Sequence, residues 1–95
     1  MATDTKTWDV VDYLKTPEDE LHYLEAAFED GDPGLIAAAI GDVARARGMT
    51  KMAQDAGLTR DAIYKAFRPE GGNPTLQTLT SVIKALGYRI SIHAA

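Results

Sequence analysis

The sequence predicts an all-α domain that ends in a single short β-strand, and three observations support this prediction. Apolar residues recur every three or four positions through most of the chain, which is the period of an amphipathic helix. Helix-capping side chains, together with proline and glycine, divide the chain into helices of ordinary length. A two-residue alternation occurs only in residues 88–93. A chain of 95 residues without cysteine is expected to form one domain around one apolar core.

The N-terminal part predicts two helical segments. Residues 8–14 form a short amphipathic piece whose packing residues are Trp8, Val11 and Leu14. Thr16 is then the N-cap of a longer helix, with Pro17 at its first position and acidic residues in its first turn. This helix ends at residues 30–31, and its inward-facing residues are Leu21, Leu24, Ala27 and Phe28.

Two further helices have equally clear boundaries. Asp32 and Pro33 repeat the cap and proline start, and the helix ends at Gly48 after cations in its last turn. Thr75 caps the last helix, which Gly87 terminates. The expected core residues of the two helices are Leu35, Ile36, Ala39, Ile40 and Val43, then Leu76, Leu79, Val82, Ile83 and Leu86.

Residues 50–67 predict two short helices joined by a tight turn. We expect Thr50 to cap the first helix, which runs through Ala56, and Gly57 to adopt a positive φ at its end. Thr59 caps the second helix. The offsets between small, turn and core residues are those of a DNA-binding helix-turn-helix.

The second helix of this motif has two different faces. Its inward stripe is Ile63, Ala66 and Phe67, and its outer, basic-leaning face is Arg60, Asp61, Tyr64, Lys65 and Arg68. An apolar back and a polar front suit a helix that packs on a core and enters a major groove. The alternative is a helix pair that serves only as scaffold, with a solvated outer face.

Residues 88–93 alternate apolar and polar side chains, which predicts a strand. A lone strand leaves backbone groups unpaired and therefore needs a partner strand. The simplest partner is the same segment of a second copy, in an antiparallel ribbon that would make the protein a homodimer. Alternatively, the tail frays or pairs with a different protein.

The charge is divided unevenly along the chain. Residues 1–43 hold eleven acidic and two basic side chains, a formal charge of −9, whereas residues 44–95 hold eight basic and three acidic ones, a charge of +5. The basic part suits phosphate neutralisation, and the acidic part is free to meet a basic partner. Alternatively, the acidic helices only keep a small protein soluble.

The sequence does not indicate an enzyme, a metal site or a cofactor. His22 and His93 are far apart and lack ligand spacing with carboxylates, and there is neither a phosphate-binding glycine loop nor a nucleophile elbow. No apolar run approaches the roughly 20 residues of a membrane span, and the N-terminus lacks a secretory pattern. We therefore expect a cytoplasmic protein without catalytic activity.

Two motifs and a loop carry a family resemblance. The motifs are GDPxxIxxAxGDxARxxG at residues 31–48 and GLTRxxxY at residues 57–64, and the loop has asparagine and proline before the last helix. Over roughly residues 13–92 the chain resembles the probable addiction-module antidote proteins, HigA-like antitoxins with an Xre/Cro phage-repressor type of helix-turn-helix. The resemblance implies a five-helix, lambda-repressor-like domain over residues 32–87, preceded by an acidic helical segment (1–31) and followed by the strand or tail (88–95).

The resemblance also implies a function and a set of contacts. The protein would neutralise a RelE/HigB-like toxin and repress the shared operon by binding operator DNA. The DNA contacts carried onto this chain are Thr50, Lys51, Thr59, Arg60, Asp61, Tyr64 and Lys65, and the outer face of the second helix adds Arg68. Asp61 must either accept a hydrogen bond from a cytosine amino group or pair with a cation such as Lys65. The alternatives are a stand-alone Xre-type transcriptional regulator and a protein-interaction module that does not bind DNA.

Overall fold

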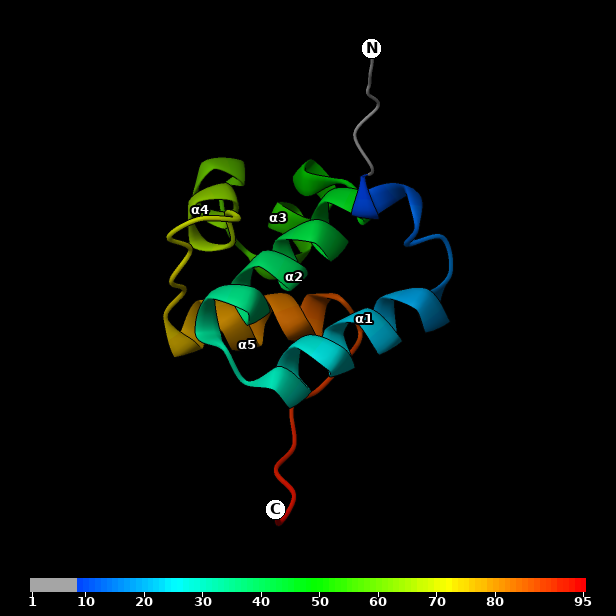
Figure 1. Ribbon diagram of the computed structural model, residues 1–95. Helices are drawn as coiled ribbons and strands as arrows, with labels where there is room; N and C mark the ends of the chain where they lie inside the picture. Colours follow the sequence, from blue (N-terminus) through cyan, green and yellow to red (C-terminus); the bar gives the residue numbers. More distant parts are fainter. Residues whose placement is uncertain (1–8) are drawn as a thin grey trace.

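The computed structural model describes residues 9–95 and is all-α, as the sequence predicts (Figure 1). A short 3₁₀ helix is followed by five α-helices in the described range: η1 (Val10–Asp12), α1 (Pro17–Asp30), α2 (Pro33–Arg47), α3 (Met49–Ala56), α4 (Arg60–Ala66) and α5 (Leu76–Ala85). Within residues 9–95, no helix is long and apolar enough to cross a membrane. Trp8, an expected packing residue, lies outside the described residues.

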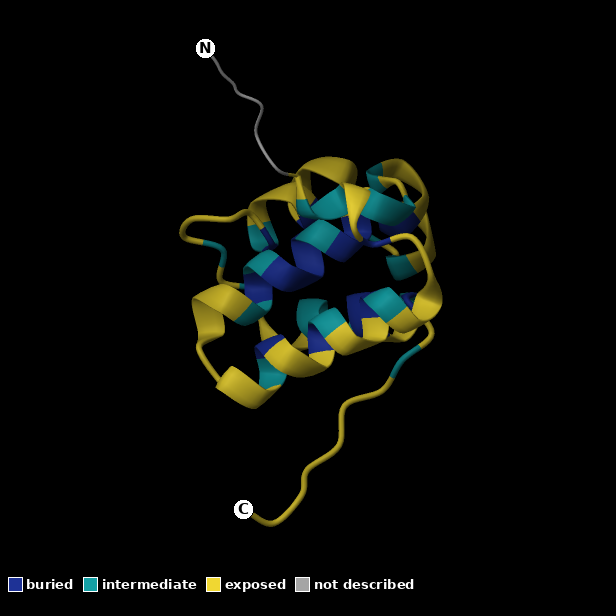
Figure 2. Cartoon of the chain, turned by 45° about the vertical axis from the view of Figure 1, so that its right-hand side comes forward, coloured by how far each residue is buried: buried dark blue, intermediate teal, exposed yellow. Residues whose placement is uncertain are grey.

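Helix α2 is the centre of the bundle. It packs against η1, α1, α3 and α4, and α3 in turn packs against α5. Figure 2 shows buried positions along most of α2. The largest fully buried side chains come from four different helices and are Ile40, Val43, Met52, Ile63 and Val82. One core therefore joins the helix pair α3–α4 to the rest of the molecule.

Four of the five predicted helix starts are confirmed by their caps. The side-chain oxygens of Thr16, Asp32, Thr59 and Thr75 each accept a hydrogen bond from the backbone N–H three residues later, at 2.9–3.1 Å. At α1 the Asp19 carboxylate also accepts from the Thr16 N–H, which completes a capping box. Each such cap stabilises its helix by about 1 kcal/mol.

The predicted start of α3 at Thr50 is wrong. The helix begins at Met49, and its N-cap is Gly48, which has a φ of 105° and offers no side-chain cap. Gly48 also ends α2 by donating its N–H to the carbonyls of Ala44 and Arg45. Because one residue serves both helices, Thr50 already lies in the first turn of α3 and cannot act as its cap.

Three leucines that were expected to face the core are exposed instead. The exposed fractions are 37% for Leu21, 46% for Leu35 and 75% for Leu76. Leu35 and Leu76 lie in the first turns of their helices, at the edge of the bundle. Helical periodicity identifies the inward face of a helix but not how far the neighbouring helices extend along it.

The predicted C-terminal strand is also wrong. Residues 88–95 have no regular secondary structure, and no strand occurs anywhere in residues 9–95. The tail leaves the end of α5, where the Tyr88 N–H donates to the Ile83 carbonyl at 3.0 Å, and then extends away from the bundle (Figures 1 and 2). An alternating pattern needs a neighbouring strand to become a sheet, and the described chain has none. The antiparallel ribbon expected from residues 88–93 therefore has no structural support.

Candidate nucleic-acid interface

Helices α3 and α4 pack against each other through a turn of fixed geometry. Gly57 adopts a left-handed conformation with a φ of 73°. Its N–H donates to the Gln54 carbonyl at 3.2 Å, and the Leu58 N–H donates to the Ala53 carbonyl at 2.8 Å. This pair of hydrogen bonds is the Schellman motif, in which glycine is favoured because it has no Cβ. The turn sets the angle at which α4 leaves α3.

The inner side of α4 is anchored in the core. Ile63 is fully buried and Phe67, the residue that ends the helix, is 3% exposed. On α2, a Cβ at Gly41 would lie 2.1 Å from the Phe67 carbonyl oxygen, so the end of α4 crosses α2 at backbone contact. Gly41 therefore fixes the position of α4. Gly41 is one of the fixed positions of the motif at residues 31–48, and a glycine in the middle of a helix often has a packing reason.

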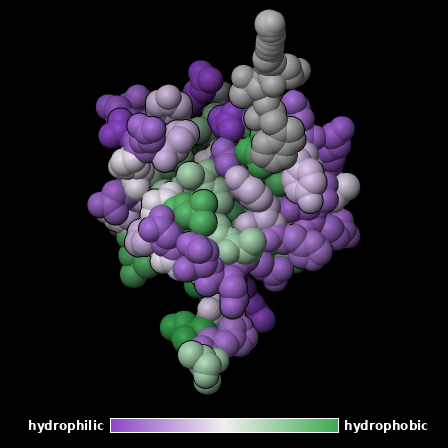
Figure 3. All heavy atoms as spheres, viewed as in Figure 1, coloured by the Kyte–Doolittle hydropathy of each residue, from purple (hydrophilic) through white to green (hydrophobic). Residues whose placement is uncertain are grey.

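All eight residues predicted to contact DNA are exposed, and six of them are on or next to α4. Tyr64 is 57% exposed. Arg60, Asp61 and Lys65 lie on the same helix, and Arg68 follows it. Thr59 is the cap of α4, and Thr50 and Lys51 lie in the first turn of α3. Figure 3 shows a hydrophilic surface at the position of α4, at the upper left of the molecule. The structure thus leaves all eight predicted residues accessible, six of them on or beside α4 and two at the start of α3.

The cations of this surface fall into two classes. Lys65 pairs with Asp61 at 3.2 Å, which confirms the ion pair anticipated for Asp61, and Lys51 pairs with Asp55 at 3.3 Å. These exposed pairs contribute only about 0.3–0.5 kcal/mol each and open readily. Arg60 and Arg68 pair with no carboxylate within residues 9–95. The positive charge that is free for phosphate therefore lies at the two ends of α4.

Two other cations of the basic C-terminal part pair with carboxylates of the acidic N-terminal part. Arg47, at the end of α2, donates to Glu20 Oε1 of α1 from Nη2 at 2.7 Å and from Nε at 2.9 Å. The hydrogen bond to Glu20 raises the pKa of Arg47 above its ordinary value. Arg45 donates to Asp42 at 2.9 Å. The division of charge along the sequence therefore overstates the number of cations available to a ligand.

Asp42 also connects α2 to α1. It accepts a 2.6 Å hydrogen bond from the Tyr23 hydroxyl while it holds Arg45. Burial raises the pKa of Tyr23 well above its ordinary value of 10.0, and the hydrogen bond to Asp42 raises it further. This cluster and the Glu20–Arg47 pair are structural links that the sequence analysis missed, since their partners are about 20 to 30 residues apart in sequence.

Comparison with known proteins identifies a family. The family model described as "Probable addiction module antidote protein" matches residues 4–94. An uncharacterized protein of Haemophilus influenzae is 38% identical over 92 residues, which cover 97% of this chain and 94% of that relative. No solved structure matches. The chain therefore belongs to the family of probable addiction module antidote proteins.

Proposed function

We propose that this antidote protein is a DNA-binding antitoxin that represses its own operon and neutralises a RelE/HigB-like toxin. The observation that carries the DNA-binding half is the exposed polar face of α4, whose opposite side is fixed in the core by Ile63 and Phe67. A rigid backing lets a helix present side chains to base edges without a large entropic cost on binding. The toxin-binding half rests on the family.

Each residue of the surface has a proposed role. Arg60, Tyr64 and Lys65 contact base edges or phosphates in the major groove, and Arg68 contacts the phosphate backbone beyond the helix. Thr59 contacts a phosphate beside α4, and Thr50 and Lys51 hold the backbone from α3. Asp61 keeps Lys65 in place in the free protein, at 3.2 Å. On DNA, the pair opens where a cytosine amino group replaces the cation.

We also propose that two copies bind one operator. Helix α4 has seven residues, and one such helix contacts too few base pairs to distinguish an operator from other DNA. Two helices held by a two-fold axis would read two half-sites about 34–36 Å apart, or a multiple of that distance. The operator is then expected to be an inverted repeat. Sedimentation of the protein on a promoter fragment gives the number of copies bound.

The DNA-binding half is tested by binding to the gene's own promoter across a series of salt concentrations. Arg60→Ala and Arg68→Ala should each weaken binding, and the loss of one phosphate contact lowers the slope of log K against log salt by about 0.9. Lys84→Ala is the matched control, because Lys84 is an exposed cation on α5, outside the helix pair. If neither arginine variant differs from the control, the assignment of α4 as the reading helix is wrong.

The antitoxin half is tested with the neighbouring gene. A small basic RelE-like protein encoded beside this gene should be toxic when expressed alone and harmless when expressed with the antidote. Promoter binding without such a neighbour would instead favour a stand-alone Xre-type regulator. A chain that binds the neighbour but no DNA would favour a protein-interaction module.

A further inference from the structure

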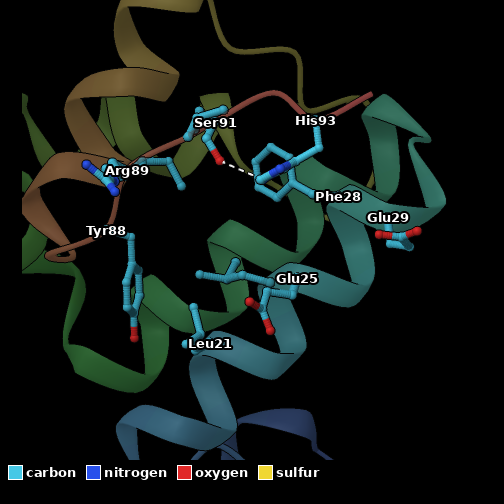
Figure 4. A pocket seen from close by; sticks show the side chains of 11 residues that line it. Leu21, Glu25, Phe28, Glu29, Tyr88, Arg89, Ser91 and His93 are labelled. Atoms are coloured by element: carbon cyan, nitrogen blue, oxygen red, sulfur yellow. Dashed lines mark hydrogen bonds between the residues drawn. The ribbon is translucent and has the colours of Figure 1, made fainter. Parts of the chain in front are cut away.

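A groove of about 690 Å³ lies between α1, the end of α5 and the C-terminal tail. Its apolar lining comes from Leu21, Leu24 and Phe28 of α1, Ile83 of α5, and Tyr88 and Ile90 of the tail. Figure 4 shows Leu21, Glu25, Phe28 and Glu29 along α1, with Tyr88, Arg89, Ser91 and His93 on the tail across from them. No residue of α3 or α4 lines this groove, and in Figure 1 the tail lies well away from α4.

The apolar surface of the groove is not filled by the described chain. Leu21 is 37% and Ile90 is 44% exposed, and Ile92, farther along the tail, is 96% exposed. Apolar side chains gathered at one concave site, as opposed to scattered singly, mark a site of association. Figure 3 shows hydrophobic atoms at the free end of the tail, below the body of the molecule.

The charges beside the groove indicate the chemistry of the partner. Helix α1 contains six carboxylates and no lysine or arginine. Glu20 is paired with Arg47, and Asp19 belongs to the capping box, but the other four pair with no cation of residues 9–95: Glu18, Glu25, Glu29 and Asp30. Glu25 and Glu29 line the groove one helical turn apart and repel each other. A cation from a partner would relieve this repulsion, whereas DNA phosphates would increase it.

The tail forms one side of the groove, and Tyr88 attaches it to the bundle. The Tyr88 hydroxyl donates to the Pro17 carbonyl at 3.4 Å, and the Arg47 guanidinium lies 5.8 Å from the centre of the Tyr88 ring. Beyond Tyr88, the only hydrogen bond found in the described tail joins Ser91 to His93 at 3.1 Å. Arg89 is the one lysine or arginine among the lining residues and pairs with neither Glu25 nor Glu29. The acidic wall of α1 therefore has no cation partner within residues 9–95, and the described tail beyond Tyr88 makes no hydrogen bond to the bundle.

We infer that this groove binds a protein partner through an apolar segment flanked by lysine or arginine. The inference rests on the proposed function, in which that partner is the toxin. It adds the surface that the partner occupies and a consequence: because α4 is on a different side of the molecule, one chain binds DNA and the partner at the same time.

The test uses the full-length chain, its promoter DNA and the purified product of the neighbouring gene. Glu25→Lys combined with Glu29→Lys should weaken partner binding at least about tenfold in a calorimetric titration, because two attractions become repulsions. The matched control is Asp12→Lys with Glu70→Lys, which changes the net charge equally at exposed acidic positions that lie neither on α1 nor in the groove. We expect a change of less than about threefold in the control, since exposed charges away from an interface act weakly.

A second variant removes the outer part of the tail side of the groove, including Ile90. Deletion of residues 90–95 leaves every core residue in place and should also weaken partner binding, by about tenfold or more. Circular dichroism should show unchanged helix content, and promoter binding should stay within about twofold of the wild type for both groove variants. A complex of promoter, chain and partner should sediment as one species.

The results distinguish an error in the groove assignment from an error in the proposed antitoxin function. Groove variants that bind the partner as the wild type does would overturn this inference and leave the antitoxin proposal standing. A wild-type chain that does not bind the partner would overturn both. Displacement of DNA by the partner would contradict the two-surface arrangement. If the groove variants instead change the sedimentation of the chain alone, the occupant is a second copy and the inference is wrong.

Discussion

Helices α1 and α4 both bury one face and expose the other, but they differ in how their charged side chains are paired. On α4, Lys65 is paired with Asp61 of the same helix, and only Arg60 at its start has no carboxylate partner within residues 9–95. On α1, Glu20 is tied to another helix while four other carboxylates have no cation in the described chain. The basic surface is thus partly neutralised and set on a rigid backing, whereas the acidic surface is uncompensated and lies beside a tail with few hydrogen bonds. Such a difference agrees with the two proposed roles, in which α4 reads DNA and α1 contributes to binding a protein partner.

The largest expected effect comes from moving α4 while α1 is left in place. In Gly41→Val the new Cβ would lie 2.1 Å from the carbonyl oxygen of Phe67. Because the Cβ is fixed to the α2 backbone and the oxygen belongs to the backbone at the end of α4, neither atom can move away by a side-chain rotation. We expect a loss of about 3 kcal/mol or more in the free energy of unfolding, the upper range for overpacking. Urea unfolding followed by circular dichroism measures it.

The control for this substitution is Gly34→Val on the same helix. There the added Cβ meets only the Asp32 carboxylate, at 3.3 Å, so the cost should be well below that at Gly41. Equal losses at the two positions would mean that the contact between α2 and α4 does not determine where α4 lies.

The next effect breaks the link between α1 and the end of α2. Arg47→Met leaves the carboxylate of Glu20, which is 8% exposed, without its cation. Removing one partner of a fully buried pair costs about 3–5 kcal/mol, and because the Arg47 side chain is 31% exposed we expect about 2 kcal/mol here. Arg47→Met combined with Glu20→Gln should recover part of this loss in a double-mutant cycle. A double variant that is less stable than the single one would show that packing, and not the unpaired charge, sets the cost.

A matched pair of cap substitutions separates the two surfaces. Thr16→Ala and Thr59→Ala each remove a hydrogen bond to a backbone N–H, at 3.1 and 3.0 Å respectively. Each should lower the free energy of unfolding by about 1 kcal/mol. Promoter binding should weaken only for Thr59→Ala, because Thr59 caps α4 and is also a proposed phosphate contact. Weakened promoter binding in Thr16→Ala would contradict the separation of the two surfaces.

The features that the sequence predicted well are those decided within a few residues. The caps at Thr16, Asp32, Thr59 and Thr75 and the positive φ of Gly57 depend on side chains and backbone three or four positions apart. Helical spacing likewise placed Ile63 and Phe67 inside and Tyr64 outside. The outer face of the candidate site could therefore be foreseen residue by residue.

The features that the sequence missed depend on contacts between distant segments. The Glu20–Arg47 pair spans 27 positions, and no local pattern shows that Arg47 is unavailable to a ligand. The same is true of the backbone contact that requires Gly41, and of the exposure of Leu76 at the edge of the bundle. At residues 88–93 the alternation was real, but strand formation also needs a second strand, which a local pattern cannot supply.

The smallest predicted effect concerns the Tyr23–Asp42 hydrogen bond that joins α1 to α2. The folded chain raises the pKa of Tyr23 above 10.0, first by burial and then through Asp42, so the folded state favours the neutral hydroxyl. The stability that this provides is complete below pH 10 and is lost as the pH rises toward the folded pKa, because the unfolded chain ionises first. The free energy of unfolding should therefore fall above pH 10 in the wild type, and Tyr23→Phe should reduce that fall. Chemical unfolding at a series of pH values from 9 to 11 measures how steeply the free energy of unfolding falls with pH in each protein.

Tyr13→Phe, at an exposed tyrosine, is the control and should keep the wild-type slope of the free energy of unfolding against pH. If Tyr23→Phe also keeps the wild-type slope, the loss of stability at alkaline pH arises from other groups, and the ionisation of Tyr23 does not cause it.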